Sequence, residues 1–168
     1  MKYIEAKEKF IQAWGVLGSS WGINRTMAQV HALLMISPDA LSAEDIMEEL
    51  KISRGNANMN IRALIDWGLV CRELKAGERK EFFNSEKEVW KVAKQIIKER
   101  RKREIDPVLK VLEEVKQIEG NKNDKKIKAF IDGVNNIESV VGKADFALEK
   151  LIKFDENAFV NTLLKIFK

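Results

Sequence analysis

Polar side chains at alternating positions between residues 54 and 60 could all bind the same kind of ligand. They are Arg54, Asn56, Asn58 and Asn60. An arginine can pair with guanine through two parallel hydrogen bonds, and an asparagine amide can both donate to and accept from adenine. Asparagine is a mediocre helix former, so a helix face that only had to be stable and solvated would more cheaply use Glu, Lys or Gln. The pattern therefore predicts contact with the base edges of double-stranded DNA.

Residues around this group could bind the phosphate backbone. Ser53, together with the free N–H groups at the start of a helix, offers a phosphate site. Gly55 permits a close approach of the protein backbone, and Arg62 could reach a phosphate. A second basic group could lie beside the phosphates or enter the minor groove, and it consists of Lys75, Arg79 and Lys80. The alternative for this second group is that its charges only keep an exposed turn soluble.

Two short helices are predicted to hold the first group in place. Ser42 is suited to cap the first helix, with acidic residues in its first turn, and Ser53 is suited to cap the second helix, over 54–67. Gly68 stands where a glycine commonly ends a helix. The second helix should bury one apolar face, made of Ala57, Ile61, Leu64 and Ile65. Two short helices joined by a tight turn form the helix-turn-helix pattern.

Directly after Gly68 the apolar period changes from that of a helix to that of a strand. Residues 69–74 and 79–84 are two candidate strands, and residues 75–78 form the turn between them. A helix-turn-helix followed at once by a charged hairpin is the winged form of the motif. The fold class predicted from this order is mainly α with a small β-hairpin wing.

Helical periodicity predicts two helices before the motif. One covers about residues 4–19, and the other begins at the capping residue Asn24 and runs to about residue 35. We therefore expect residues 1–85 to form a winged helix-turn-helix DNA-binding domain. Residues 1–20 of that domain are expected to be shared with a dimer interface.

The rest of the chain is predicted to be helical. One helical stretch runs from residue 86 to about 118, with a kink or a restart at Pro107 and with Asp106 as the expected cap. Two further amphipathic helices follow, over 126–141 and 145–167. Their apolar stripes exceed what one small winged domain can cover. Residues 86–168 are therefore expected to be a helical dimerisation region, with a flexible linker near 120–124.

Composition limits the classes of function. The 168 residues carry a net charge of +4, which suits a polyanionic partner without requiring one. A lone cysteine, Cys71, and a lone histidine, His31, make an internal disulfide or a Cys/His zinc site implausible. No catalytic motif is found, so we expect no enzyme, no metal and no cofactor. The charged N-terminus is unlike a signal peptide and no apolar run would span a bilayer, so a cytoplasmic protein without a membrane partner is expected.

Several stretches resemble the GbsR class of MarR-like winged helix-turn-helix regulators, over about residues 10–112. The stretches that carry the resemblance are residues 53–64, 66–70, 77–83 and 103–107. The resemblance implies a homodimeric repressor or regulator, of a kind associated with genes for choline uptake and glycine-betaine synthesis. The positions that match the DNA-contacting ones are Arg54, Asn56, Asn58, Asn60, Arg62, Arg79 and Lys80. For a small-molecule effector the sequence offers only the aromatic residues Trp14 and Trp21.

Three alternatives stay open at this point. Winged helices also serve as protein–protein docking modules, which touch no nucleic acid. A regulator could sense oxidation through Cys71 if that thiol were exposed and its pKa lowered. The protein could also bind DNA without sequence preference, as an architectural protein does.

Overall fold

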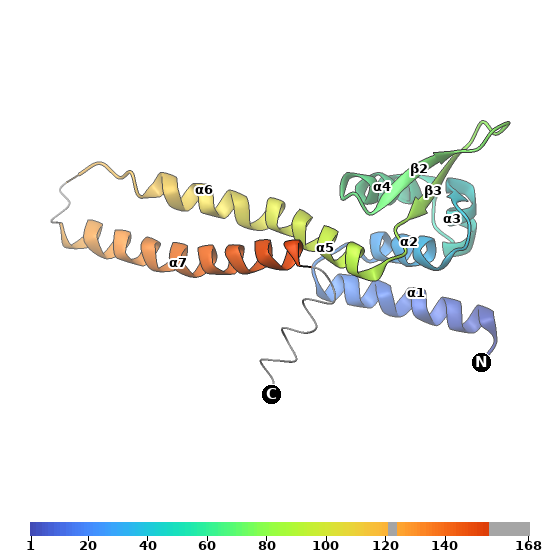
Figure 1. The fold of residues 1–168 in the computed structure, drawn as a ribbon, viewed down its shortest axis with the longest axis horizontal. Helices are drawn as coiled ribbons and strands as arrows, with labels where there is room; N and C mark the ends of the chain where they lie inside the picture. The colour runs from blue at the N-terminus through green and yellow to red at the C-terminus, as the bar shows by residue number, and fades with distance from the viewer. Residues whose placement is uncertain (121–123, 155–168) are drawn as a thin grey trace. The chain divides into compact units, whose positions relative to one another are not determined.

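The computed structural model describes residues 1–120 and 124–154 (Figure 1). The chain divides into two compact units, Met1–Val92 and Ala93–Lys168. All strands of the described chain lie in the first unit, and the described part of the second unit is helical. This order of elements confirms the predicted fold class, a mainly α-helical chain with a winged helix-turn-helix. The assignment of residues 1–85 to DNA binding and of residues 86–168 to dimerisation stays a prediction.

The first unit begins with two helices in very close contact, α1 (Tyr3–Ser20) and α2 (Arg25–Ile36). Asn24 caps α2 as predicted, because its side chain accepts a hydrogen bond from the Met27 N–H. A Cβ atom on Gly18 would lie 2.5 Å from the Cβ of Ala28, and one on Gly15 would lie 2.7 Å from a side-chain carbon of α2. The two helices therefore pack at a distance that excludes side chains at these two positions of α1.

The helix-turn-helix consists of α3 (Ala43–Leu50) and α4 (Arg54–Asp66). The predicted caps are confirmed, since the Ser42 hydroxyl accepts from the Asp45 N–H and the Ser53 hydroxyl accepts from the Asn56 N–H. Lys51 takes a left-handed conformation at the end of α3, with φ of 53°, which turns the chain toward α4. The buried side chains of α4 include the predicted Ala57, Ile61 and Leu64.

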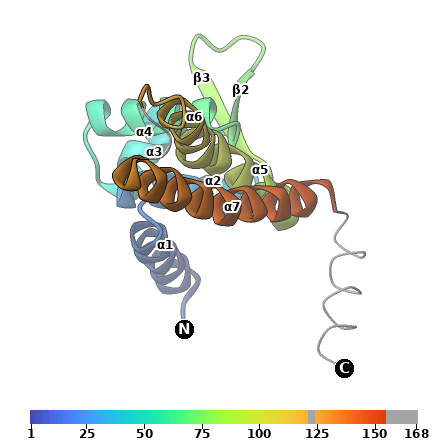
Figure 2. The same cartoon turned by 90° about the vertical axis from the view of Figure 1, so that its left-hand side faces the viewer.

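A small antiparallel sheet completes the motif, with β2 (Val70–Leu74) and β3 (Glu81–Ser85) as the hairpin. Both predicted strands are confirmed with ends shifted by one or two residues, and Gly68 has a positive φ of 68° just after α4. A third strand, β1 (Leu41–Ser42), pairs with β3 in the order β1-β3-β2. It was not predicted, because two residues are too short to show a period. Figure 2 shows the hairpin reaching beyond α3 and α4.

The second unit begins inside α5 (Val89–Arg100), which continues through a π-helical turn, η1 (Arg101–Ile105), into α6 (Asp106–Val115). The Asp106 N–H donates to the Arg101 carbonyl five residues earlier. Pro107 has no N–H to give to an α-helical bond, and a wider π turn accommodates it. The hydrogen-bond pattern changes before Pro107, but the chain stays helical there and does not restart, and the expected cap is wrong, because Ile105 holds that position and no side chain caps α6.

The last described helix, α7 (Lys125–Lys153), lies beside α6 (Figure 1). Lys116 binds Glu138 at 2.6 Å, and Arg101 pairs with Asp145 through two hydrogen bonds. The sequence predicted two helices separated near residue 143, and this is wrong, because α7 passes through that position without a break. Residues 121–123 of the expected linker and residues 155–167 of the expected last helix lie outside the described part. No helix within it is long and apolar enough to span a bilayer.

Candidate nucleic-acid interface

The N-terminal half of α4 presents a long basic side chain in a defined position. Arg54, the first residue of α4, is exposed and forms an ion pair with Glu44 of α3, with 3.2 Å between the guanidinium Nη1 and the carboxylate. Glu44 belongs to the acidic first turn of α3, where negative charge suits the helix dipole. The first turn of α4 carries no acidic residue. Its positive dipole end is therefore open to an external anion.

The predicted asparagines of α4 do not behave alike. Asn56 and Asn58 are half-exposed, whereas Asn60 is only 2% exposed, so the expectation that all three are exposed is wrong for Asn60. The Asn60 amide donates to the Asn56 carbonyl at 2.8 Å and to the Asn56 Oδ1 at 2.7 Å. Asn60 therefore positions the side chain of Asn56. The sequence held a signal for this, since position 60 lies on the same helical stripe as Ala57 and Leu64.

Nothing in the described structure requires a glycine at position 55, the second residue of α4. It is exposed, and a Cβ atom built on it would meet nothing within 4 Å. Its φ is not positive, so the backbone does not require glycine either. Glycine costs a helix about 0.5–1 kcal/mol relative to alanine. This cost is explained if something outside the chain approaches the helix here.

The hairpin carries the second predicted basic group on a surface of mixed charge. The turn bends at Gly77, whose φ is 83°, and Arg79 and Lys80 beside it are exposed. Lys75 is half-buried, with its ammonium group 4.2 Å from the centre of the Phe82 ring. Acidic residues alternate with the basic ones, namely Glu73, Glu78 and Glu81. The wing is thus not uniformly positive, and its effect on a duplex must depend on which side chains face it.

A hollow lies between α4 and the inner face of the hairpin. Its lining comes from α4, β2 and β3 and consists of Asn58, Ile61, Arg62, Ile65, Arg72, Glu81 and Phe83. Arg72 forms an ion pair with Glu81 across the two strands, at 3.2 Å. Arg62 has no hydrogen bond or ion pair with any residue that the structure describes. Arg72 was not among the predicted site residues, because its neighbours depend on strand register rather than on local spacing.

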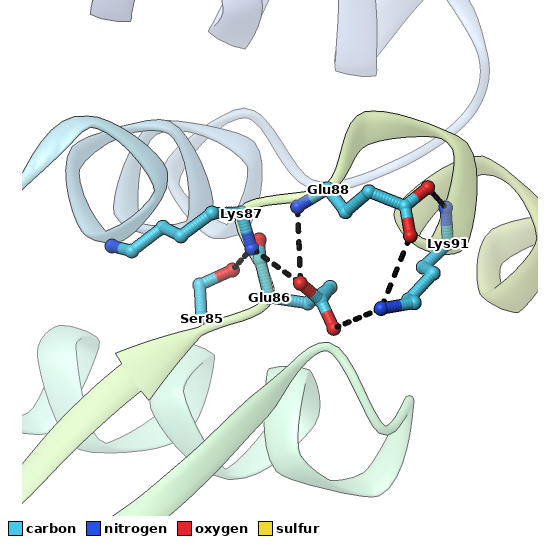
Figure 3. A network of polar contacts seen from close by, with 5 residues as sticks. All are labelled: Ser85, Glu86, Lys87, Glu88 and Lys91. Carbon is cyan, nitrogen blue, oxygen red and sulfur yellow. Dashed lines mark hydrogen bonds and ion pairs between the residues drawn. The ribbon is translucent and has the colours of Figure 1, made fainter.

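The segment between β3 and α5 is fastened to the helical core of the first unit. The Lys87 ammonium group donates to the carbonyls of Leu34 and Ser37, at 2.5 and 2.7 Å. It thereby supplies hydrogen bonds to carbonyls at the C-terminal end of α2. Partial burial lowers the pKa of Lys87 by desolvation. Figure 3 shows the neighbouring network, in which the Glu86 carboxylate accepts from the backbone N–H groups of Lys87 and Glu88. The direction in which the chain leaves the hairpin is therefore fixed by polar contacts.

The aromatic residues suggested for an effector lie apart. The Trp14 ring packs against Phe10, with 5.7 Å between the ring centres, and Trp21 at the end of α1 is 52% exposed. No ring contact between Trp14 and Trp21 is found in the described chain. A role for them in effector binding stays a prediction. Among the described residues, no group of three or more potential metal ligands is found.

The two residues singled out by their rarity also have defined surroundings. His31 is buried in α2, its Nε2 has no hydrogen-bond partner among the described residues, and burial lowers its pKa to about 4. Cys71 is exposed on β2, with its thiol 3.6 Å from the Asn84 carbonyl. Cys71 therefore meets one of the two conditions named for a redox sensor, an exposed thiol. Exposure alone does not make it a sensor.

Comparison with known proteins agrees with this geometry. Residues 21–81, which run from the end of α1 to the start of β3, match a family model described as the MarR family. A solved structure described as the crystal structure of a transcriptional regulator is similar to this chain, with a TM-score of 0.55 and 20% sequence identity. The match covers 86% of this chain and 99% of that one, and at this identity it shows the fold. No curated protein matches the chain significantly.

Proposed function

We propose that this protein is a sequence-specific DNA-binding regulator of transcription, of the MarR type. The observation that carries the proposal is the N-terminal half of α4, where Arg54, Gly55, Asn56 and Asn58 are accessible on a helix whose other face is buried. The winged helix-turn-helix fold supports it, and so does the match of residues 21–81 to the MarR family. The similar solved structure, described as a transcriptional regulator, supports the same class of function.

In the proposed mechanism, the first half of α4 enters the major groove of a duplex. Arg54 exchanges its ion pair with Glu44 for a bidentate pair with guanine, and Asn56 and Asn58 contact adenine edges. Ser53 and the first N–H groups of α4 bind a phosphate, and Arg62 binds another. Lys75, Arg79 and Lys80 of the wing lie along the backbone or in the minor groove. We leave the buried Asn60 out of this set and assign it to the positioning of Asn56.

The regulator is proposed to act as a homodimer, and α7 supports this. One face of α7 packs on its own helical hairpin through residues such as Val134, Glu138 and Asp145. A second face carries exposed small or apolar side chains at heptad spacing, Phe130, Ile137, Val140, Ala144 and Ala147. Apolar side chains of α1 and its C-cap are also exposed, including Tyr3, Ile4, Val16 and Trp21. A second copy of the chain would cover such faces.

A dimer would present two α4 helices to successive major grooves, with half-sites about 34 Å apart on a pseudo-palindromic operator. Occupancy of that operator would repress the adjacent genes. A small ligand that changes the separation of the two α4 helices would modulate repression. The resemblance to the GbsR class is compatible with such an effector and does not fix its identity. We further propose that the protein acts in the cytoplasm.

Selection from a pool of random duplexes at near-physiological salt tests the proposal. We expect enrichment of a pseudo-palindrome with two equivalent half-sites. Enrichment of a single half-site would refute the dimeric arrangement, and binding without enrichment would indicate an architectural DNA-binding protein. Absence of binding would refute a DNA-binding function and favour a docking module. Treatment of the complex with mild peroxide, compared between the wild type and Cys71→Ser, would separate redox sensing from sensing of a ligand.

A further inference from the structure

We propose that the hollow between α4 and the hairpin is a seat for one phosphate of the DNA backbone, held jointly by Arg62 and Arg72. The inference rests on the proposed DNA-binding function and adds Arg72, a strand residue, to the contacts. The chemistry recognised is a phosphodiester anion, and its source is the duplex whose bases α4 contacts. The hollow lies beside Asn58, so the phosphate it takes belongs to the same binding event.

The state of the two guanidinium groups supports this assignment. Arg62 is exposed and has no partner among the residues that the structure describes. Arg72 uses a single nitrogen, Nη1, for its contact with Glu81, so most of its N–H donors remain open. Both arginines line one hollow, together with the carboxylate of Glu81. With two positive charges and one negative charge, the lining keeps a net positive charge of one, which suits an added anion.

The strand register explains why Arg72 reaches this place. Arg72 is opposite Phe83, and Leu74 is opposite Glu81, so these four side chains share one face of the hairpin. Phe83 on that face is buried, and it lines the hollow together with Ile61 and Ile65 of α4. The face that carries Arg72 is therefore the face toward α4. Glu81 then acts as a positioning residue, which holds the Arg72 guanidinium over the rim of the hollow.

The competing explanation is that Arg72 and Glu81 form only a cross-strand ion pair that supports the hairpin. Both side chains are about half exposed, at 54% and 52%, and exposed pairs of this kind contribute little to stability. A purely structural pair would leave the salt dependence of DNA binding unchanged when it is removed. Removal of a phosphate contact would change the salt dependence, because each neutralised phosphate releases counterions from the duplex.

The test measures binding to the selected duplex, by fluorescence anisotropy over a range of salt concentrations, for the wild type and for Arg72→Gln. In a homodimer this substitution removes one phosphate contact from each protomer, so it should reduce the magnitude of the slope of log K against log salt by about 1.8 and weaken binding about 60-fold at 0.1 M salt. Lys128→Ala is the matched control, because it removes one positive charge from an exposed position on α7. The control should leave both the slope and the affinity unchanged.

A second set of duplexes locates the contact, with one backbone phosphate at a time replaced by an uncharged methylphosphonate. For the wild type, one replacement near each half-site should weaken binding, and for Arg72→Gln the same replacement should have little further effect. Arg72→Lys should restore part of the slope, since it restores the charge without the planar fork. A wild-type slope for Arg72→Gln would overturn this inference and leave the proposed function intact. A wild-type protein that binds no duplex would overturn both.

Discussion

The substitution Gly55→Ala should move stability and DNA binding in opposite directions. A Cβ atom at this position meets nothing within 4 Å, and the backbone has no positive φ, so alanine fits the free protein. Alanine is favoured over glycine in a helix by up to about 1 kcal/mol, so the free energy of unfolding should rise by about 0.5–1 kcal/mol. A methyl group on the surface that meets the duplex would instead hold the backbone away from it.

The expected loss of affinity follows from the hydrogen bonds that such a displacement breaks. A hydrogen bond to a charged group such as a phosphate contributes about 1.5–3 kcal/mol. Loss of one such bond therefore corresponds to binding that is about 10- to 150-fold weaker, and a homodimer would lose one at each half-site. Part of the loss should appear on every duplex, because a phosphate contact carries no sequence information.

The assay compares urea unfolding with anisotropy titrations for the wild type, Gly55→Ala and Gly142→Ala. Gly142 is the matched control, because it lies within α7 and a Cβ atom there also meets nothing within 4 Å. Gly142→Ala should show the gain in stability without the loss of affinity. Wild-type affinity for Gly55→Ala would refute the close approach of a duplex to α4 at this residue. A loss of stability would refute the structural reasoning itself.

Three further substitutions test other parts of the molecule. Asn58→Ala should weaken binding to the selected duplex by about 1–3 kcal/mol for each of the two half-sites and spare random DNA, as anisotropy would show; an equal loss on both would contradict a base contact. Gly18→Ala should lower the free energy of unfolding by about 1–3 kcal/mol, because its Cβ would lie 2.5 Å from that of Ala28; unchanged stability would show that α1 moves away freely. His31→Leu should reduce the decrease in the free energy of unfolding that occurs as the pH falls. Burial lowers the pKa of His31 in the folded wild type from 6.5 to about 4. Between pH 6.5 and pH 4 the histidine is therefore protonated in the unfolded chain and neutral in the folded chain. This costs the wild type up to about 3 kcal/mol by pH 4, and equal pH slopes in urea unfolding would exclude His31 as the cause.

The parts of the fold that the sequence predicts well are those fixed by local chemistry. Ser42, Ser53 and Asn24 each cap a helix through a hydrogen bond to a residue three positions later, so a short stretch of sequence is enough to find them. Gly68 ends α4 for an equally local reason, its positive φ. The change from helical to alternating periodicity after it depends only on neighbouring residues. These signals together gave the winged helix-turn-helix without any long-range information.

The parts that the sequence did not reveal depend on contacts between distant residues. Lys87 binds carbonyls of Leu34 and Ser37, about fifty positions earlier, and no spacing rule connects them. The pairing of Arg72 with Glu81 follows from hairpin register, which a shift of one residue would abolish. The uninterrupted α7 was missed for a related reason, since its heptad faces continue through Gly142 and packing outweighs the low helix propensity of that glycine.

The candidate site is where local preference and observed structure disagree most. Gly55, Asn56 and Asn58 fall within four positions of α4, and each is a poorer helix former than the residues that usually occupy exposed helix positions. The helix forms because its other face is buried and because Ser53 satisfies its first turn. A sequence under selection for stability alone could have replaced Gly55 and Asn58 at little cost to packing, since Gly55 touches nothing and Asn58 is half-exposed, whereas Asn56 also accepts a hydrogen bond from the buried Asn60 amide. Their presence is explained by an external partner that approaches the backbone of α4 closely and forms hydrogen bonds with side-chain amides. A DNA duplex does both.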